Sequence, residues 1–231
     1  MLIQSAGILA HLATLAGIDP VRSALAAAPR LVTGAAAAAP ANNGYALAAV
    51  VMALMILAVV YVLVSIGRAQ AVGAGEGPAW AGVVVPILAV IGMGVAAYLT
   101  FVETQNVSPV CGPVGDCGSV QASPFSRLFG VLPVGLLGLA GYVAILAAWA
   151  VARFGTDPLA GLARVAAFGM AVFGVLFSIY LTYLELWVIK AVCIWCLSSA
   201  VLITALMVLT VSPALAALQA GDEEEQDAEP A

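Results

Sequence analysis

The chain alternates between long apolar runs and short polar connections. A hydrocarbon core of about 30 Å requires roughly 20 apolar residues per helix, and several runs reach this length without an internal charge. Lipid offers no partner for backbone N–H and C=O groups, so these continuous runs predict helices and not the alternating strands of a barrel. The predicted spans are Ala46 to Ile66, Trp80 to Val102, Val131 to Ala152, Val165 to Leu184, and Ala191 to Ser212.

The composition places the chain in the same class. Apolar residues make up 64% of the sequence and charged residues 8%, and the mean hydropathy is +1.14. These values exclude a soluble globular protein, so the predicted fold class is an all-α membrane protein. A sequence pI near 4.6 with seven basic residues excludes nucleic acid as a partner. A transporter would need polar groups at mid-membrane, and the spans carry almost none.

The two ends of the chain differ from its apolar middle. Residues 1–45 contain an apolar start without the basic residues of a signal peptide, and they are predicted to form an extracytoplasmic or interfacial segment. Residues 46–79 comprise the first span and a cytoplasmic connection. Residues 213–231 form an acidic cytoplasmic tail, which is expected to be disordered from Gly221 onward because of its charge.

The four cysteines fall into two pairs, each next to a predicted span. Cys193 and Cys196 form a Cys-x-x-Cys motif in the first turn of the last span, where unpaired N–H groups and the helix dipole favour a thiolate. Cys111 and Cys117 lie in a Gly/Pro-rich loop that is able to change partners. Thiolates exchange disulfides through a mixed-disulfide intermediate. Two such pairs at the membrane edge therefore predict an electron relay.

Other uses of the cysteines stay open. The loop pair is also compatible with a static structural disulfide, and the second pair with buried, inert thiols. Four thiolates suit a tetrahedral zinc ion, but the loop spacing is wide for a zinc knuckle and the single histidine, His11, is remote. We therefore predict no metal site.

The basic residues suggest an orientation. If the loop of residues 103–130 faces outward, Arg68, Arg153 and Arg164 lie in cytoplasmic connections, whereas Arg127 and Lys190 lie outside. This small excess agrees with the positive-inside rule. Cysteine oxidation is also favoured outside the cytoplasm, so the cysteine chemistry carries the assignment.

Motifs around the cysteines resemble a known family. The loop pair is followed by Val120-Gln-Ala-Ser123-Pro-Phe125, and Tyr180-Leu-Thr-Tyr183-Leu-Glu185 leads to Cys193-Ile-Trp-Cys196. In this order, residues 80–212 resemble bacterial homologues of vitamin K epoxide reductase. The resemblance implies a four-helix transmembrane bundle around a quinone pocket, with residues 103–130 as the active-site loop and the first span as an extra N-terminal helix.

The resemblance also implies a role for each cysteine. Cys111 would meet the partner protein, and Cys117 would carry electrons to Cys193. Cys196 would then face the quinone. All four are thereby predicted as catalytic residues.

Further positions extend the comparison. Ser123 would cover the quinone pocket, and Phe125 would contribute to its apolar wall. Ala200 replaces the tyrosine of relatives that resemble the vertebrate enzyme, which favours plain quinone reduction over epoxide reduction. Glu185 is a conceivable proton source, although we interpret it as a solvated carboxylate at a helix end.

The predicted function is that of a thiol:quinone oxidoreductase in the bacterial cytoplasmic (inner) membrane, with its active site on the periplasmic side. It would reoxidise an extracytoplasmic thioredoxin-fold (DsbA-like) protein and pass the electrons to ubiquinone or menaquinone. Many bacterial relatives carry a fused thioredoxin-like domain that this chain lacks, so a separate partner is expected. The alternatives are a quinone or vitamin K epoxide reductase with another thiol donor, and a non-enzymatic protein that binds metal through the four cysteines.

Overall fold

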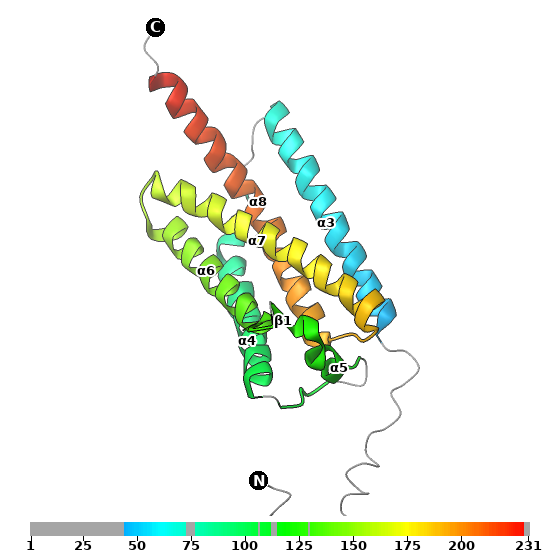
Figure 1. Ribbon diagram of the computed structural model, residues 1–231. Helices are drawn as coiled ribbons and strands as arrows, with labels where there is room; N and C mark the ends of the chain where they lie inside the picture. The colour runs from blue at the N-terminus through cyan, green and yellow to red at the C-terminus, as the bar shows by residue number, and fades with distance from the viewer. Residues whose placement is uncertain (1–43, 73–76, 106, 112–114, 129, 229–231) are drawn as a thin grey trace, which may run out of the picture. The chain divides into compact units, whose positions relative to one another are not determined.

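Five long helices form the described part of the chain (Figure 1). The computed structural model describes residues 44–72, 77–105, 107–111, 115–128 and 130–228. All five helices are long and apolar enough to cross a membrane, which confirms the all-α membrane fold class. They are α3 (Tyr45–Val72), α4 (Ala81–Gln105), α6 (Val134–Phe154), α7 (Leu159–Tyr183) and α8 (Ile194–Ala228), and α7 continues into the π-helical turn η2 (Leu184–Ile189).

Four of these helices pack as a bundle, and α3 lies beside it. The helix α7 contacts mainly α8 and α6, α4 contacts α6 and α8, and α3 contacts α8. The buried residues of α3 recur at helical spacing along one stripe, so only one face of this helix meets the bundle. They are Ala48, Val51, Met55, Val62 and Ala69. The arrangement agrees with the predicted four-helix bundle and extra first helix.

The helix directions bring both cysteine pairs to one end of the bundle. The helices α4 and α7 end there, whereas α3, α6 and α8 begin there. Arg68, Arg153 and Arg164 consequently lie at the opposite end. The Tyr45 hydroxyl at the start of α3 donates a hydrogen bond to the backbone oxygen of Lys190, which ties the first helix to the cysteine end.

The loop between α4 and α6 carries short elements of its own. The helix α5 (Cys117–Ala122) is followed by the 3₁₀ turn η1 (Pro124–Ser126). Two-residue strands, β1 (Arg127–Leu128) and β2 (Leu132–Pro133), then pair antiparallel and lead into α6. This loop lies at the cysteine end of the bundle (Figure 1).

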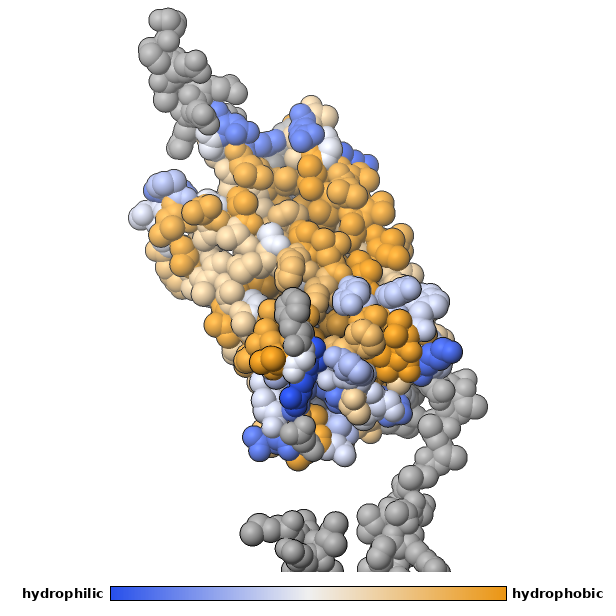
Figure 2. Space-filling view, viewed as in Figure 1, coloured by the Kyte–Doolittle hydropathy of each residue, from blue (hydrophilic) through white to orange (hydrophobic). Residues whose placement is uncertain are grey.

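The outer surface matches a lipid environment. Figure 2 shows a broad hydrophobic band between hydrophilic patches at both ends of the face in view. On α3, Leu54, Leu57 and Leu63 are more than half exposed. Large apolar side chains lose nothing by facing hydrocarbon, so this pattern identifies a multi-pass membrane protein.

The predicted end of the last span was wrong. The helix α8 does not end at Ser212 but continues through Pro213 to Ala228. The expected disorder from Gly221 onward is therefore contradicted for Gly221 to Ala228. Ala, Leu, Gln and Glu dominate this extension and favour helix, and Gln219 Nε2 donates a hydrogen bond of 2.7 Å to the Ala69 backbone oxygen of α3. Residues 1–43 of the predicted N-terminal segment (residues 1–45) and the last three residues of the chain lie outside the described residues.

A close approach of α4 and α6 depends on Gly135. A Cβ atom added at this residue would lie 2.7 Å from Thr100 N and 3.0 Å from Leu99 C, which are backbone atoms of α4. We expect Gly135→Ala to destabilise the folded protein by about 1–3 kcal/mol, because the two backbones must move apart. Thermal unfolding in detergent measures the effect. The control is Gly94→Ala, where an added Cβ meets nothing within 4 Å, and equal unfolding temperatures for both variants would contradict the prediction.

Candidate active site

The second cysteine pair caps the start of α8. The Cys193 backbone oxygen accepts the first helical hydrogen bond, from Leu197 N at 3.0 Å, and its Sγ accepts one from Cys196 N at 3.4 Å. Cys193 thus occupies the N-cap position, and only Cys196 lies in the first turn where both were predicted. A hydrogen bond from the Cys196 thiol lowers the pKa of Cys193, with help from the backbone N–H groups of Cys196 and Trp195 and against the effect of burial.

The loop cysteines are joined in a disulfide. Cys111 and Cys117 have Cα atoms 6.0 Å apart, and Cys117 N donates to Cys111 Sγ at 3.0 Å. Asp116 caps the helix α5, because its carboxylate accepts hydrogen bonds from Ser119 N at 3.0 Å and Ser119 Oγ at 2.6 Å. These bonds from Ser119 lower the pKa of Asp116. The cap fixes the backbone immediately before Cys117.

The loop docks directly on the segment before Cys193. Asp116 N donates a hydrogen bond of 2.9 Å to the Val192 backbone oxygen. Gly115 has φ +100°, and an added Cβ would lie 2.6 Å from the same oxygen. Only glycine combines this conformation with this approach. The contact therefore sets the distance between the loop and the start of α8.

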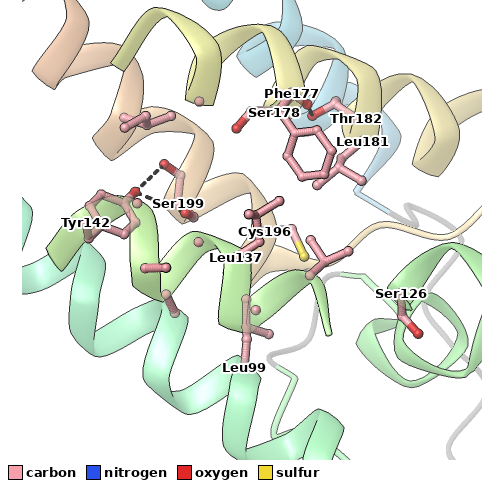
Figure 3. A pocket seen from close by; sticks show the side chains of 18 of the residues that line it. Leu99, Ser126, Leu137, Tyr142, Phe177, Ser178, Leu181, Thr182, Cys196 and Ser199 are labelled. Carbon is pink, nitrogen blue, oxygen red and sulfur yellow. Dashed lines mark hydrogen bonds between the residues drawn. The ribbon is translucent and has the colours of Figure 1, made fainter. Parts of the chain in front are cut away.

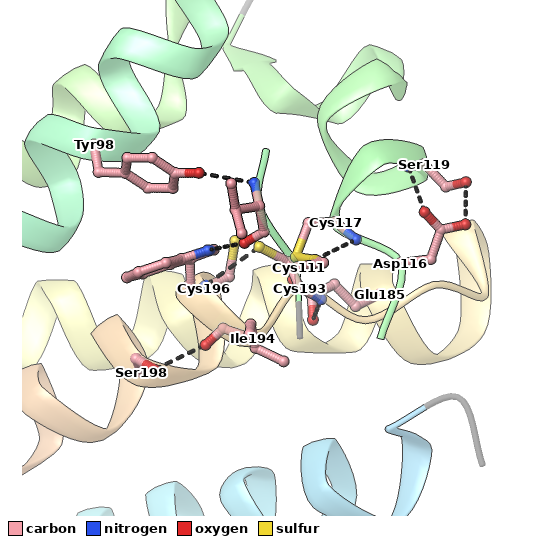
Figure 4. The surroundings of a disulfide bond; sticks show 12 residues. Tyr98, Cys111, Asp116, Cys117, Ser119, Glu185, Cys193, Ile194, Cys196 and Ser198 are labelled. Carbon is pink, nitrogen blue, oxygen red and sulfur yellow. Dashed lines mark hydrogen bonds between the residues drawn. A yellow bond between two sulfur atoms is a disulfide. The ribbon is translucent and has the colours of Figure 1, made fainter. Parts of the chain in front are cut away.

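This docking gathers both cysteine pairs in one cluster. Cys117 and Cys193 are fully buried together with Leu99, Val120 and Ala191, and Cys111 and Cys196 pack against this group. Figure 4 shows the four cysteine side chains close together near the start of α8. The structure thus brings together all four cysteines that the sequence singled out.

Two aromatic residues hold the chain next to Cys111. Tyr98 and Trp195 pack with ring centroids 4.7 Å apart. Val110 N donates to the Tyr98 hydroxyl at 2.8 Å, and Trp195 Nε1 donates to the Val110 oxygen at 2.9 Å. Both backbone polar groups of Val110 are bound, so the residue before Cys111 is fixed in place.

The sequence-based interpretation of Glu185 as a solvated carboxylate was wrong. Its side chain is 2% exposed and not solvated. The chain turns back after η2 through Lys190, which has left-handed geometry with φ 57°. This turn places the Glu185 carboxylate next to the start of α8, where Oε2 accepts a hydrogen bond of 3.4 Å from Cys193 N.

Glu185 also lies close to both thiols. One carboxylate oxygen of Glu185 and the sulfur atoms of Cys193 and Cys196 all lie within 4.8 Å of one another. These three groups are of a kind that binds metal ions. The loop cysteines are paired in the disulfide, so the alternative zinc site built from four thiolates does not match the arrangement described here.

A cavity of about 500 Å³ opens beside Cys196. Figure 3 shows Cys196 among apolar side chains such as Leu99, Leu137 and Leu181, which come from α4, α6 and α7. Of the four cysteines, all of which are described, Cys196 lines the cavity. The predicted pocket residues Ser123 and Phe125 line it as well.

The cavity fits a quinone in size and chemistry. Small-molecule pockets typically have volumes of about 300–1,000 Å³, mostly apolar walls and a few polar groups that fix the ligand's orientation. Gln121 lines the cavity, and its Oε1 atom is buried without a hydrogen-bond partner. Ser123 Oγ donates to the Val120 oxygen at 2.7 Å, which leaves its oxygen free to accept a further bond.

Sequence reasoning missed other polar groups in the wall. The Tyr142 hydroxyl lies 3.0 Å from both the backbone oxygen and Oγ of Ser199. Glu103 is 7% exposed, and its Oε2 accepts a hydrogen bond of 3.0 Å from Gly135 N. All three side chains line the cavity. A lone carboxylate near the end of an apolar run was the available signal for Glu103, because such groups are costly in lipid unless they have a role.

The protein has several membrane-spanning helices and two neighbouring cysteine pairs, one of which lies beside an apolar cavity. These features define the class of membrane thiol–disulfide oxidoreductases. The chain is a member of the vitamin K epoxide reductase family, whose model matches residues 83–211. This match covers more than half of the chain and confirms the resemblance found in the sequence. Members of this family act with quinones in general.

Proposed function

We propose that this protein oxidises a separate thioredoxin-fold (DsbA-like) protein outside the cytoplasm and passes the electrons to a membrane quinone. The observation that carries the proposal is the single cysteine cluster, in which Cys117 and Cys193 are buried together and Cys196 lines an apolar cavity. The proposed location is the bacterial cytoplasmic membrane, with the cysteine end on the periplasmic side.

The relay begins when the partner reduces the Cys111–Cys117 disulfide. The Cys117 thiolate then attacks Cys193 Sγ, which breaks the Cys193–Cys196 bond and releases the Cys196 sulfur. Attack of Cys111 on Cys117 restores the loop disulfide and releases Cys193. The described state, with the loop pair joined and Cys193 and Cys196 free, is the product of this sequence.

The hydrogen bonds at the start of α8 favour the last of these steps. Cys193 leaves as a thiolate, and the Cys196 N–H points at its sulfur. The lowered pKa of Cys193 makes it a better leaving group. The relay therefore ends with Cys193 and Cys196 reduced, and Cys196 borders the cavity.

The proposed quinone-binding residues are Ser123, Phe125 and Gln121. They line the cavity together with Cys196. A bound quinone, either ubiquinone or menaquinone, would accept two electrons and two protons. Phe125 offers an apolar face, whereas Ser123 and Gln121 offer hydrogen-bonding groups to a ring with two carbonyl oxygens. The mostly apolar walls of the cavity would keep water away from Cys196.

The partner would meet the loop near Cys111. The side chains of Val107 and Val110 beside it are 45% and 75% exposed, whereas Cys117 is buried. A visiting thiol therefore has its nearest approach at Cys111. The hydrogen bonds of Tyr98 and Trp195 to the Val110 backbone hold the chain next to Cys111 in place.

Quinone reduction by the purified protein in detergent tests the proposal. With a reduced thioredoxin-fold donor, we expect the wild type to convert one quinone for each donor disulfide formed. Cys196→Ala should lower this rate at least about a thousandfold, because it removes the reacting thiol. The control Asp157→Asn removes an exposed carboxylate that pairs with Arg164 at 3.9 Å, at the opposite end of the bundle, and should retain the full rate. No quinone reduction by wild type, or undiminished reduction by Cys196→Ala, would reject the proposal.

A further inference from the structure

Glu185 is a buried acidic residue that lies near both thiols of the second cysteine pair and lines the cavity. It lines the cavity with Cys196, and its carboxylate oxygen lies within 4.8 Å of the Cys193 and Cys196 sulfurs. Figure 4 places its side chain next to Cys193 at the start of α8. The relay described above does not use this residue.

The chemistry of the pair requires a proton acceptor at this place. Reduction of the Cys193–Cys196 disulfide takes up two electrons and two protons, and oxidation releases both protons. Bulk water does not reach Cys193, whose side chain is fully buried. A carboxylate and a thiolate this close repel each other, so a proton shared between them lowers the energy of the group.

We propose that Glu185 is a catalytic residue that carries the proton of the Cys196 thiol. When Cys117 attacks Cys193 and the Cys193–Cys196 bond breaks, the Glu185 carboxyl group gives its proton to the departing Cys196 sulfur. When the pair is oxidised, the Cys196 thiol returns this proton to the Glu185 carboxylate as its electrons leave. The proton is then held in the wall of the cavity in which, under the proposed function, a quinone needs protons.

The hydrogen bond to Cys193 N allows this role to be separated from simple positioning. Glutamine has nearly the same shape as glutamate and can accept the same hydrogen bond through its amide oxygen, but it cannot take up a proton. Aspartate can take up a proton but is one methylene shorter. A proton carrier therefore tolerates Glu185→Asp better than Glu185→Gln, whereas a positioning residue shows the reverse order.

The first measurement is the rate at which the fully reduced protein is oxidised by quinone in a single turnover. We expect Glu185→Gln to slow this step at least about a hundredfold and Glu185→Asp to stay within about tenfold of wild type, as for loss and displacement of a general acid–base group. Asp157→Asn is the matched carboxylate control. A Glu185→Gln rate within twofold of wild type, or a slower rate in Glu185→Asp than in Glu185→Gln, overturns the proposal.

The second measurement involves no quinone. Infrared difference spectra between the oxidised and the dithiothreitol-reduced protein report protonated carboxyl groups through their C=O stretch. We expect reduction to remove one such band in wild type and Asp157→Asn, and we expect no such change in Glu185→Gln. If reduction removes the same band in Glu185→Gln, the role of Glu185 is overturned. A wild type that shows the band but reduces no quinone rejects the proposed function alone.

Discussion

A variant that lacks Cys111 and Cys196 is expected to form a disulfide between Cys117 and Cys193 in most molecules after mild oxidation. These two side chains are fully buried in one cluster. The Asp116–Val192 hydrogen bond ties the backbone next to Cys117 to the backbone next to Cys193. Disulfides form readily only where Cα atoms already lie within about 7 Å and the side chains face each other. Peptide mapping by mass spectrometry without reductant identifies the bond.

The control for this disulfide-forming variant is a second variant that lacks Cys117 and Cys196 and thus retains Cys111 and Cys193. Cys111 packs at the edge of the cluster and follows Val110, which the two aromatic residues hold. We therefore expect a much lower yield of the Cys111–Cys193 bond. Equal yields in the two variants would show that the loop moves freely and that the observed docking does not select the exchanging cysteine.

Gly115→Ala is expected to uncouple the two cysteine pairs. The substitution introduces a Cβ 2.6 Å from the Val192 oxygen at a residue with φ +100°, so the loop must lift from the segment before Cys193. A displacement of about 1 Å is enough to cost on the order of a hundredfold in a reaction that depends on alignment. We expect a loss of this size in donor-driven quinone reduction. Single-turnover oxidation of the already reduced Cys193–Cys196 pair should remain near the wild-type rate.

Gly118→Ala is the matched control for this loop, because an added Cβ there meets only Asp116 Oδ1 at 3.5 Å, an ordinary contact. It should keep both rates. If Gly115→Ala slows both reactions equally, the substitution damages the cavity or the fold, and the contact with Val192 has no special part in electron transfer between the pairs.

The membrane fold was largely predictable because its signal is local. Each span appears as an apolar run long enough for the hydrocarbon core, and the five runs correspond to α3, α4, α6, α7 and α8. The ends of helices were less predictable. Beyond Ser212 the chain loses its apolar character but keeps strong helix formers, so α8 continues after the predicted span has ended.

The active site was predictable only in part. The cysteine spacings and their positions next to spans indicated a relay, and Ser123 and Phe125 followed from the resemblance. Glu185 was misinterpreted, since hydropathy cannot show that the chain turns back at Lys190 and covers the carboxylate. The contact between Gly115 and Val192 joins residues more than 70 positions apart, and no local pattern reports such a contact.

By itself, the sequence determined that this protein crosses the membrane several times and carries two thiol pairs at one end, because run length and residue position suffice for both conclusions. Only the tertiary structure decided which cysteines lie together, that Cys196 borders a cavity, and that a buried carboxylate lies beside it. These features arise where α4, α6, α7 and α8 meet the docked loop. The energy of such contacts depends on distances between segments, which spacing along the chain does not encode.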